Sequence, residues 1–176
     1  MPSDKRADVF KRLDEAQQNA LLPALAQAER EDIRQLSSYI EGTAGAIMSS
    51  EYATLKPNMM VKDAINMLRF EAPDTETIYF AYVLDQARKI LGVLSLKQLI
   101  LAPEEQNINE LMEMNLLTAY VDTDQDEVAK IIARYDLLAL PIIDHQDMMV
   151  GIVTYDDAMD VVSEEATEDF LKVGAV

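Results

Sequence analysis

Carboxylates recur at helical spacing near the C-terminal end of the chain. They are Asp157, Asp160, Glu164 and Glu168, at i, i+3, i+7 and i+11, with Glu165 and Asp169 beside them. On one continuous helix these side chains would share a face. Residues 155–170 hold seven acids and no base, and each like-charged i,i+4 pair costs ~0.2–0.5 kcal/mol. The pattern therefore indicates either a solvated acidic face or a face that binds a cation.

A second group of acids lies further upstream, at Asp122, Asp124, Asp126 and Glu127, and Asp136 follows after the expected end of a helix. Each has an ordinary structural alternative, because Asp126 can cap the helix, Asp124 can be a turn residue and Asp136 can lie in the loop after the helix. As ligands, their hard oxygens suit Mg²⁺, which keeps much of its own water and needs only one or two carboxylates per site. Ca²⁺ or Mn²⁺ could occupy the same positions in vitro, although the sequence has no EF-hand spacing.

Composition narrows the classes of function. The net charge is −17, and residues 121–170 hold 14 acids against Lys130 and Arg134. Nucleic acid and an anionic membrane surface are poor partners for such a chain, because both require clustered Lys and Arg. Cysteine is absent and the single histidine, His145, lies in an expected turn. With no His–Asp, Ser–His or glycine-rich phosphate motif, the sequence does not indicate an enzyme.

The acidic residues lie on the second copy of an internal repeat. Ile47-Met48 opens a segment that later reads Val83-Leu84-Asp85 and then Gly92-Val93-Leu94-Ser95. Leu111-Met112 opens a second segment that reads Ile142-Ile143-Asp144 and then Gly151-Ile152-Val153-Thr154. The aspartate and the glycine are seven positions apart in both copies. The repeat predicts two units of the same fold.

Each copy is expected to fold in the order β-α-β-β-α, which gives an α/β (α+β) fold class. The first extended piece ends at Thr54 or Val121. The predicted helices and strands that follow are 61–69, 78–84 and 90–94 in copy one, and 126–135, 139–143 and 149–153 in copy two. The last helix of each copy begins at Ser95 or Thr154. Ser95-x-x-Gln98 has capping-box form, and Thr154-x-x-Asp157 and Thr123-x-x-Asp126 are acidic versions of it. The longest aliphatic stretch, 137–143, is much shorter than the ~20 residues of a spanning helix.

The order of elements, together with the Gly-h-h-[Ser/Thr]-x-x-[Asp] junction, resembles a tandem pair of CBS domains. Three stretches are similar to MgtE-type magnesium transporters: EGTAGAIM at 41–48, ETIYFAY at 76–82 and EEATEDFLKVGAV at 164–176. The resemblance divides the chain into four parts: 1–45, the remnant of an N-terminal helical domain; 46–108, CBS domain 1; 109–170, CBS domain 2; and 171–176, the start of the connection to a C-terminal transmembrane domain.

The resemblance also implies a site, a state of assembly and a place in the cell. In MgtE proteins, carboxylates at eight matching positions hold Mg²⁺ at subunit and domain interfaces: Asp124, Asp126, Asp136, Asp157, Asp160, Glu165, Glu168 and Asp169. The family's fold implies a homodimer through the CBS domains, at the cytoplasmic face of the inner membrane, attached to a transmembrane domain. The expected function is a Mg²⁺-sensing regulatory region that closes a pore when intracellular Mg²⁺ binds.

Two other readings remain open. CBS pairs commonly bind adenine nucleotides such as ATP, whose ribose is often held by the acid of the Gly-h-h-[Ser/Thr]-x-x-Asp junction. Copy two keeps that acid as Asp157, whereas copy one has Gln98, with Lys97 beside it as a phosphate ligand or a solvated lysine. Tyr79, Phe80 and Tyr82 are expected in the core rather than at a ligand. The third reading is a purely structural dimerisation module whose acids only keep it soluble.

Overall fold

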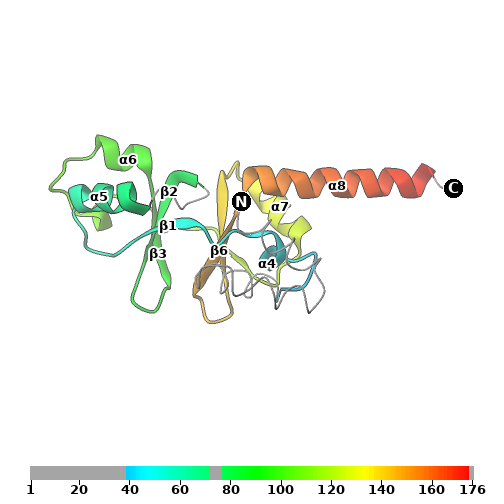
Figure 1. Ribbon diagram of the computed structural model, residues 1–176, viewed down its shortest axis with the longest axis horizontal. Coiled ribbons are helices and arrows are strands. Elements are labelled where there is room, and N and C mark those ends of the chain that lie inside the picture. Colours follow the sequence, from blue (N-terminus) through cyan, green and yellow to red (C-terminus); the bar gives the residue numbers. More distant parts are fainter. Residues whose placement is uncertain (1–38, 72–76, 175–176) are drawn as a thin grey trace, which may run out of the picture.

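The structure, a computed structural model, describes residues 39–71 and 77–174, with side chains at 39–71 and 79–164. It shows two repeats of the same five elements (Figure 1). The first repeat consists of β1 (Tyr52–Leu55), α5 (Val61–Glu71), β2 (Thr77–Leu84), β3 (Ile90–Ser95) and α6 (Leu96–Leu101). The second consists of β4 (Ala119–Tyr120), α7 (Gln125–Arg134), β5 (Ala139–Ile143), β6 (Met149–Thr154) and α8 (Tyr155–Gly174). The short helix α4 (Ala44–Ile47) precedes the first repeat, and the 3-10 turn η3 (Ile108–Glu110) connects the two.

The predicted order β-α-β-β-α is therefore confirmed in both copies. The largest difference is at the end of α8, which continues to Gly174, past the expected end of CBS domain 2 at residue 170. The backbone is therefore helical through most of the stretch 171–176 that was expected to begin a connection. The helices expected within residues 1–38 lie outside the described residues. In the part of the chain that the structure describes, no helix is both long enough and apolar enough to cross a bilayer.

Each repeat forms a three-stranded mixed sheet. In the first, β1 pairs with β2 in parallel and β2 pairs with β3 antiparallel, and the second repeats this order as β4-β5-β6. The two glycines of the repeat occupy matching positions, since Gly92 lies opposite Val83 and Gly151 lies opposite Ile142. The sequence repeat is therefore also a repeat of strand register.

The β-hairpins turn in the same way in both repeats. Oδ1 of Asp85 accepts hydrogen bonds from the amides of Ala87 and Lys89, both at 2.9 Å. Oδ1 of Asp144 does the same for the amides two and four residues later. Arg88, in the first turn, has a left-handed φ of 64°, and its carbonyl accepts a hydrogen bond of 3.0 Å from the amide of Met149. The aspartate that marks the repeat in the sequence thus organises the turn, and the two hairpins lie side by side.

The segment that opens each repeat packs against the sheet of the other repeat. Met48 lies on Gly151 of β6, and Ser49 exchanges backbone hydrogen bonds of 2.8 and 2.9 Å with Ile152. In the same way, Met112 lies on Gly92 of β3, where the following glutamate exchanges bonds of 3.0 and 2.9 Å with Val93. The opening segment of copy one thus adds to the second sheet, and the opening segment of copy two adds to the first.

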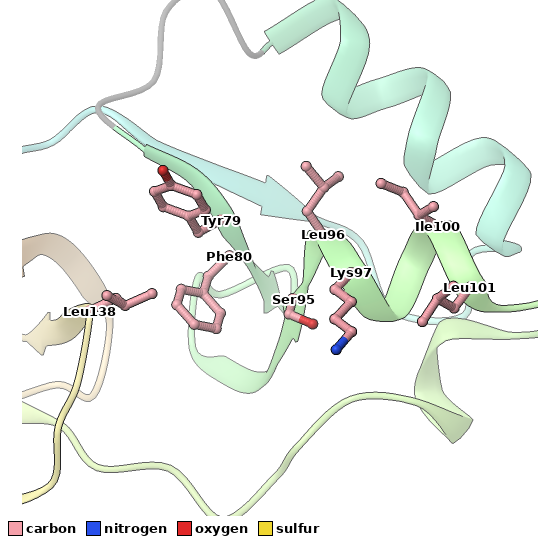
Figure 2. A pocket seen from close by; sticks show the side chains of 8 residues that line it. All are labelled: Tyr79, Phe80, Ser95, Leu96, Lys97, Ile100, Leu101 and Leu138. Atoms are coloured by element: carbon pink, nitrogen blue, oxygen red, sulfur yellow. The ribbon is translucent and has the colours of Figure 1, made fainter.

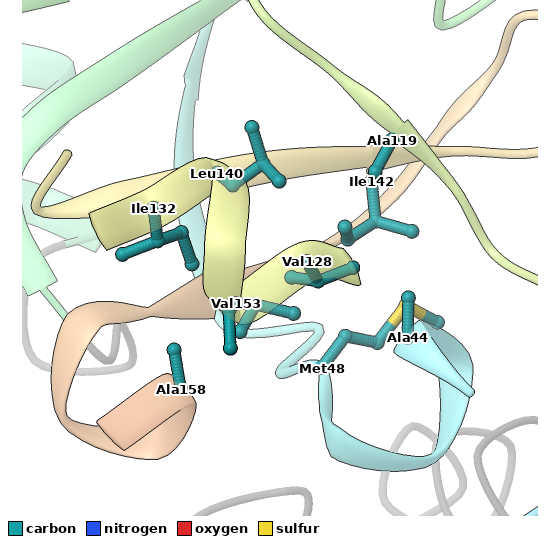
Figure 3. Packing of buried hydrophobic residues seen from close by; sticks show 10 residues of the cluster. Ala44, Met48, Ala119, Val128, Ile132, Leu140, Ile142, Val153 and Ala158 are labelled. Carbon is teal, nitrogen blue, oxygen red and sulfur yellow. The ribbon is translucent and has the colours of Figure 1, made fainter. Parts of the chain in front are cut away.

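Three apolar clusters hold this arrangement together. Helices α5 and α6 cover the first sheet and α4, α7 and α8 cover the second, each on the side away from the other sheet (Figure 1). Figure 3 shows the second core, a single cluster that includes Ala44 of α4, Met48 and, from α7, Val128 and Ile132. A third cluster, Tyr82, Leu84, Met149 and Ile152, draws on both sheets. Burying such side chains contributes roughly 1.5–3 kcal/mol each, so the two repeats form one packed body.

Candidate functional site

Residues 121–127, here called the acidic loop, comprise the connection between β4 and α7 and the first turn of α7, and carry Asp122, Asp124, Asp126 and Glu127. Helix α7 begins at Gln125, so its N-cap is Asp124, which makes no side-chain capping hydrogen bond. The expected Thr123-x-x-Asp126 capping box is therefore wrong by one residue. Asp126 instead lies exposed in the first turn, where a negative charge is favourable to the helix dipole. Asp124 and Asp126 both present their carboxylates to solvent.

Asp136 lies immediately past the end of α7, where it is exposed and has a left-handed φ of 51°. The amide of Leu137 donates to the carbonyl of Ile132 at 3.0 Å, which is the long-range hydrogen bond of a Schellman motif. Aspartate is among the few residues other than glycine that adopt this conformation readily. Asp136 thus ends the helix and at the same time offers an exposed carboxylate.

Asp157 and Asp160 lie on α8, which leaves the body of the protein as a single continuous helix (Figure 1). Asp157 is half-buried and accepts a hydrogen bond of 3.0 Å from the Thr154 hydroxyl, which also donates to Asp156. Asp160 is exposed one turn later. The predicted continuous helix is present along the whole acidic stretch. The side chains of Glu165, Glu168 and Asp169 lie outside the described side chains, so their predicted role remains untested.

The predicted carboxylates do not converge within one chain. Among residues 39–71 and 79–164, no three His, Cys, Asp or Glu side chains are grouped closely enough to hold a metal ion. The acids occupy three exposed places instead: the acidic loop, the end of α7 and the start of α8. A cation bound at any of them would take the rest of its ligands from water or from another chain or domain.

His145 contacts the acidic loop, which the sequence did not predict. Its Nε2 lies 2.8 Å from Oδ2 of Asp122, and its ring stacks on Tyr120 with the centroids 4.8 Å apart. The expected exposure of His145 is confirmed, since 64% of its side chain is accessible. The contact follows from the parallel pairing of β4 with β5, which places Tyr120 opposite Ile143. The hydrogen bond from His145 lowers the pKa of the Asp122 carboxyl.

A separate apolar pocket of about 480 Å³ opens on the first repeat. It is lined by Tyr79, Phe80, Ser95, Leu96, Lys97, Ile100, Leu101 and Leu138 (Figure 2). Figure 2 shows Leu138, from the second repeat, beside the ring of Phe80. The prediction that the aromatic residues of β2 are all core residues is thus wrong for Tyr79, which is 64% exposed. It holds only in part for Phe80, because that side chain also lines the pocket. It is right for Tyr82, which is buried between the sheets.

Gln98 directly follows the pocket residue Lys97 in the sequence and has the place in the first repeat that Asp157 has in the second. Gln98 is the third residue of α6, whose N-cap is Ser95, and the two form reciprocal hydrogen bonds. Ser95 Oγ accepts from the Gln98 backbone amide at 3.1 Å, and Gln98 Oε1 accepts from the Ser95 backbone amide at 2.9 Å. The predicted capping box is therefore confirmed. Gln98 Nε2 also donates to the Leu111 carbonyl at 3.2 Å. Both ends of its side chain thus bond within the protein and help to hold α6 and the following segment in place.

Comparison with known proteins decides the family. The family model for the CBS domain matches twice, at residues 44–105 and 108–164. The chain belongs to the CBS-domain family. A second model, the MgtE intracellular N domain, matches residues 1–42. The predicted resemblance to MgtE-type magnesium transporters is confirmed by these matches and by the relatives that follow.

Among the relatives of this CBS pair, the magnesium transporter MgtE of Thermus thermophilus is 44% identical over 147 residues, which is 84% of this chain and 33% of the relative. MgtE of Enterococcus faecalis is 38% identical, with the same coverage of both chains. The chain thus spans about a third of the length of these relatives. The names of both relatives are those of transporters, in agreement with the prediction of a non-enzymatic chain.

Two solved structures share the CBS pair at high similarity. The soluble part of a magnesium transporter superposes with a TM-score of 0.90 at 37% identity, covering 94% of this chain and 65% of the other. The cytosolic domain of the Mg²⁺ channel MgtE in complex with ATP superposes with a TM-score of 0.87 at 38% identity, covering 92% of this chain and 66% of the other. The predicted tandem CBS fold is confirmed by these matches.

Proposed function

We propose that this chain is the Mg²⁺-sensing regulatory region of a magnesium transporter, at the cytoplasmic face of the inner membrane. The observation that carries the proposal is the exposure of carboxylates on the acidic loop and on α8 in a CBS pair whose relatives are named magnesium transporters. The eight proposed ligands are those named from the sequence: Asp124, Asp126, Asp136, Asp157, Asp160, Glu165, Glu168 and Asp169.

The mechanism follows from the separation of these acids. Because one chain groups no three of them within its described residues, Mg²⁺ would bind where acids of two chains or domains face each other. A homodimer through the CBS domains supplies such facing surfaces. Without Mg²⁺ the facing charges repel, and each unscreened pair ~7 Å apart costs roughly 2 kcal/mol at an effective dielectric near 20.

Helix α8 would transmit the effect of Mg²⁺ binding to the pore. It projects from the second repeat (Figure 1) and would lead toward the C-terminal transmembrane domain. Mg²⁺ would draw the two copies of α8 together and hold the pore closed, and low Mg²⁺ would let them separate. This response is a population shift, so it requires Mg²⁺ to bind the closed state more tightly than the open state.

Thermal unfolding tests the proposal. A ligand that binds only the folded state adds about 2.7 kcal/mol at one hundred times its Kd, and for a chain of this size each kcal/mol raises Tm by about 2–4 °C. We expect MgCl₂ to raise Tm by about 5–10 °C above NaCl of equal ionic strength. Equal shifts in the two salts would reduce the effect to charge screening and contradict the proposal.

A pair of variants locates the effect. Asp124→Asn together with Asp126→Asn should reduce the extra shift from MgCl₂, because both substitutions remove charge from the acidic loop. Asp63→Asn is the matched control, since Asp63 is an exposed acid in the first turn of α5, at the corresponding place in the first repeat.

Light scattering in saturating Mg²⁺ should show a dimer, and a monomer at high concentration would contradict the proposed assembly.

Nucleotide binding is a second candidate function, favoured by the pocket of the first repeat. The ring of Phe80 offers a stacking face for a purine, and Lys97 places a positive charge at the same pocket. One solved relative was determined in complex with ATP. Because Gln98 is engaged in the capping box, we propose that the base and the phosphates, rather than the ribose, provide most of the affinity for ATP.

Calorimetric titration with ATP and AMP separates this candidate from the first. Lys97→Ala should weaken ATP binding about tenfold, which corresponds to one charge-assisted hydrogen bond, and should affect AMP less. Lys89→Ala is the control, because Lys89 is an exposed lysine in the turn of the first hairpin. If Lys97→Ala binds both nucleotides as the unaltered protein does, Lys97 does not contact the phosphates.

A further inference from the structure

The acidic loop has a backbone partner that lies far away in the sequence. Residues 40–45, here called the junction, run alongside the loop, and Thr43 forms an antiparallel bridge with Asp124. Three backbone hydrogen bonds join the two segments: Ala44 N to Thr123 O at 2.8 Å, Gly45 N to Val121 O at 2.8 Å, and Gln125 N to Gly42 O at 2.9 Å. The backbone on both sides of Asp124 is thus held by the junction.

This close approach depends on a glycine. A Cβ at Gly45 would lie 2.8 Å from Cγ2 of Val121 and 2.6 Å from Cγ of Tyr39. Real Cβ atoms are essentially never found so close to other heavy atoms. Any residue other than glycine at position 45 must therefore displace the side chain of Val121 in the acidic loop, the Tyr39 ring or both.

The junction itself is firmly anchored. Gly42 turns the chain with a φ of 86°, and the Thr43 hydroxyl donates to the Ile40 carbonyl at 2.6 Å. Beyond the turn, Ala44 and Met48 are fully buried in the core of the second repeat. Because packed interiors resist displacement, the core holds the junction in place, and the acidic loop packs against it.

We propose that the junction positions the acidic loop for cation binding, with Gly45 as a positioning residue for the carboxylates of Asp124 and Asp126. The role in cation binding rests on the function proposed above, whereas the placement of the loop does not. Linkage is reciprocal: a cation bound by these carboxylates stabilises the loop geometry that the junction favours, and therefore also stabilises the junction. Since the junction overlaps the end of the residues matched by the MgtE intracellular N domain, 1–42, a change at the cation site would also reach that side of the chain.

Amide hydrogen exchange of the 176-residue chain without divalent cations tests the placement of the loop. In Gly45→Ala, the Gln125 amide should exchange about tenfold faster, as expected when one backbone hydrogen bond is lost. Gly92→Ala is the matched control, because its Cβ would meet Met112 at 2.7 Å in the first repeat and does not touch the junction. Exchange of the Gln125 amide at the same rate in Gly45→Ala and in the unaltered protein would overturn the proposal.

Mg²⁺ titration tests the link to the cation. Gly45→Ala should lower Mg²⁺ affinity about tenfold, the lower end of what the loss of a ligand's support costs, and Gly92→Ala should leave it unchanged. Combining Gly45→Ala with Val121→Ala removes the Cγ2 atom and should restore part of the affinity, which a general loss of stability would not do. Unchanged affinity in folded Gly45→Ala would overturn the link.

The two proposals fail in different ways. If the unaltered chain binds no Mg²⁺, the proposed sensing function of this chain is wrong, and the metal-free exchange still decides whether the junction positions the loop. If Mg²⁺ binds and protects amides of α8 but leaves the Ala44 and Gly45 amides unprotected, sensing stands and the link through the junction is wrong. Protection of both sets of amides supports both proposals.

Discussion

Substituting the glycine of β6 should destabilise the protein more than substituting its counterpart in β3. A Cβ at Gly151 would lie 2.5 Å from Sδ of Met48, 2.8 Å from its Cγ and 3.0 Å from the carbonyl oxygen of Ser49. For a Cβ at Gly92, the three nearest atoms all belong to the side chain of Met112, at 2.7, 2.8 and 3.0 Å. The two positions are related by the repeat but differ in what must move.

The difference in cost follows from these neighbours. Met48 is fully buried, and the carbonyl oxygen of Ser49 accepts a hydrogen bond of 2.9 Å from Ile152, so neither can withdraw without losing packing or a bond. Met112 is only half-buried and has a flexible side chain that can turn aside. Overpacking of a core costs typically 1–3 kcal/mol. We expect Gly151→Ala to cost about 2 kcal/mol and Gly92→Ala less than about 1 kcal/mol.

Urea unfolding of the two variants measures these costs. In thermal unfolding, a loss of 2 kcal/mol should lower the Tm of a chain of this length by about 4–8 °C. A third variant tests the cause: Met48→Ala alone should cost about 2–5 kcal/mol, and less in the presence of Gly151→Ala, because the added methyl group occupies part of the space. Equal losses at Gly151 and Gly92, or strict additivity of Gly151→Ala with Met48→Ala, would refute this reasoning.

Three further predictions concern single interactions. Ser95→Ala should cost about 1 kcal/mol in urea unfolding through loss of the cap, and Ser95→Thr should keep most of it. His145→Ala should raise the pKa of Asp122 toward its ordinary value of 3.8 in an NMR titration. Because folding lowers the pKa of Asp122, the stabilisation from its contact with His145 is present at pH values above 3.8. It is lost as the pH falls through the folded-state pKa. Tyr52→Phe should cost about 1 kcal/mol in urea unfolding, since the Tyr52 hydroxyl accepts a hydrogen bond of 3.0 Å from Arg88 and donates one of 3.2 Å to the Met149 carbonyl; an unchanged midpoint would show that these two bonds add nothing.

The elements of the fold were predictable because they depend on short-range signals. Apolar runs bounded by turn residues predicted the strands, and Ser95 with Gln98 predicted the start of α6 from local hydrogen-bonding chemistry. The aspartates of the two turns gave the repeat a fixed spacing, which the structure explains by side-chain bonds to backbone amides. Such signals need no knowledge of distant parts of the chain.

What the sequence could not predict depends on distant neighbours. The exchange of opening segments between the sheets joins Met48 to Gly151, about one hundred positions later, and no local pattern reports it. Tyr79 was expected in the core because an apolar strand gives no sign of where a sheet stops covering it. The pairing of His145 with Asp122 required the register of β4 on β5.

The candidate site was predictable only as a set of residues. Helical spacing correctly placed Asp157 and Asp160 on one continuous helix. The spacing could not show that the acids of the described residues stay apart in a single chain, since that depends on how α7 and α8 leave the body. The ligand positions drawn from the family resemblance therefore remain predictions.

The exchanged opening segments also bear on how such a molecule could have arisen. A polypeptide with one repeat alone would have an opening methionine without a glycine to cover, and a strand glycine with nothing packed upon it. Two identical copies would satisfy each other by the same exchange that Met48 and Met112 make here. A duplicated gene that joined those copies end to end would preserve every contact and add only a tether. In its contacts the present chain is thus equivalent to a dimer of two similar halves, of which the second carries most of the excess of acidic over basic residues.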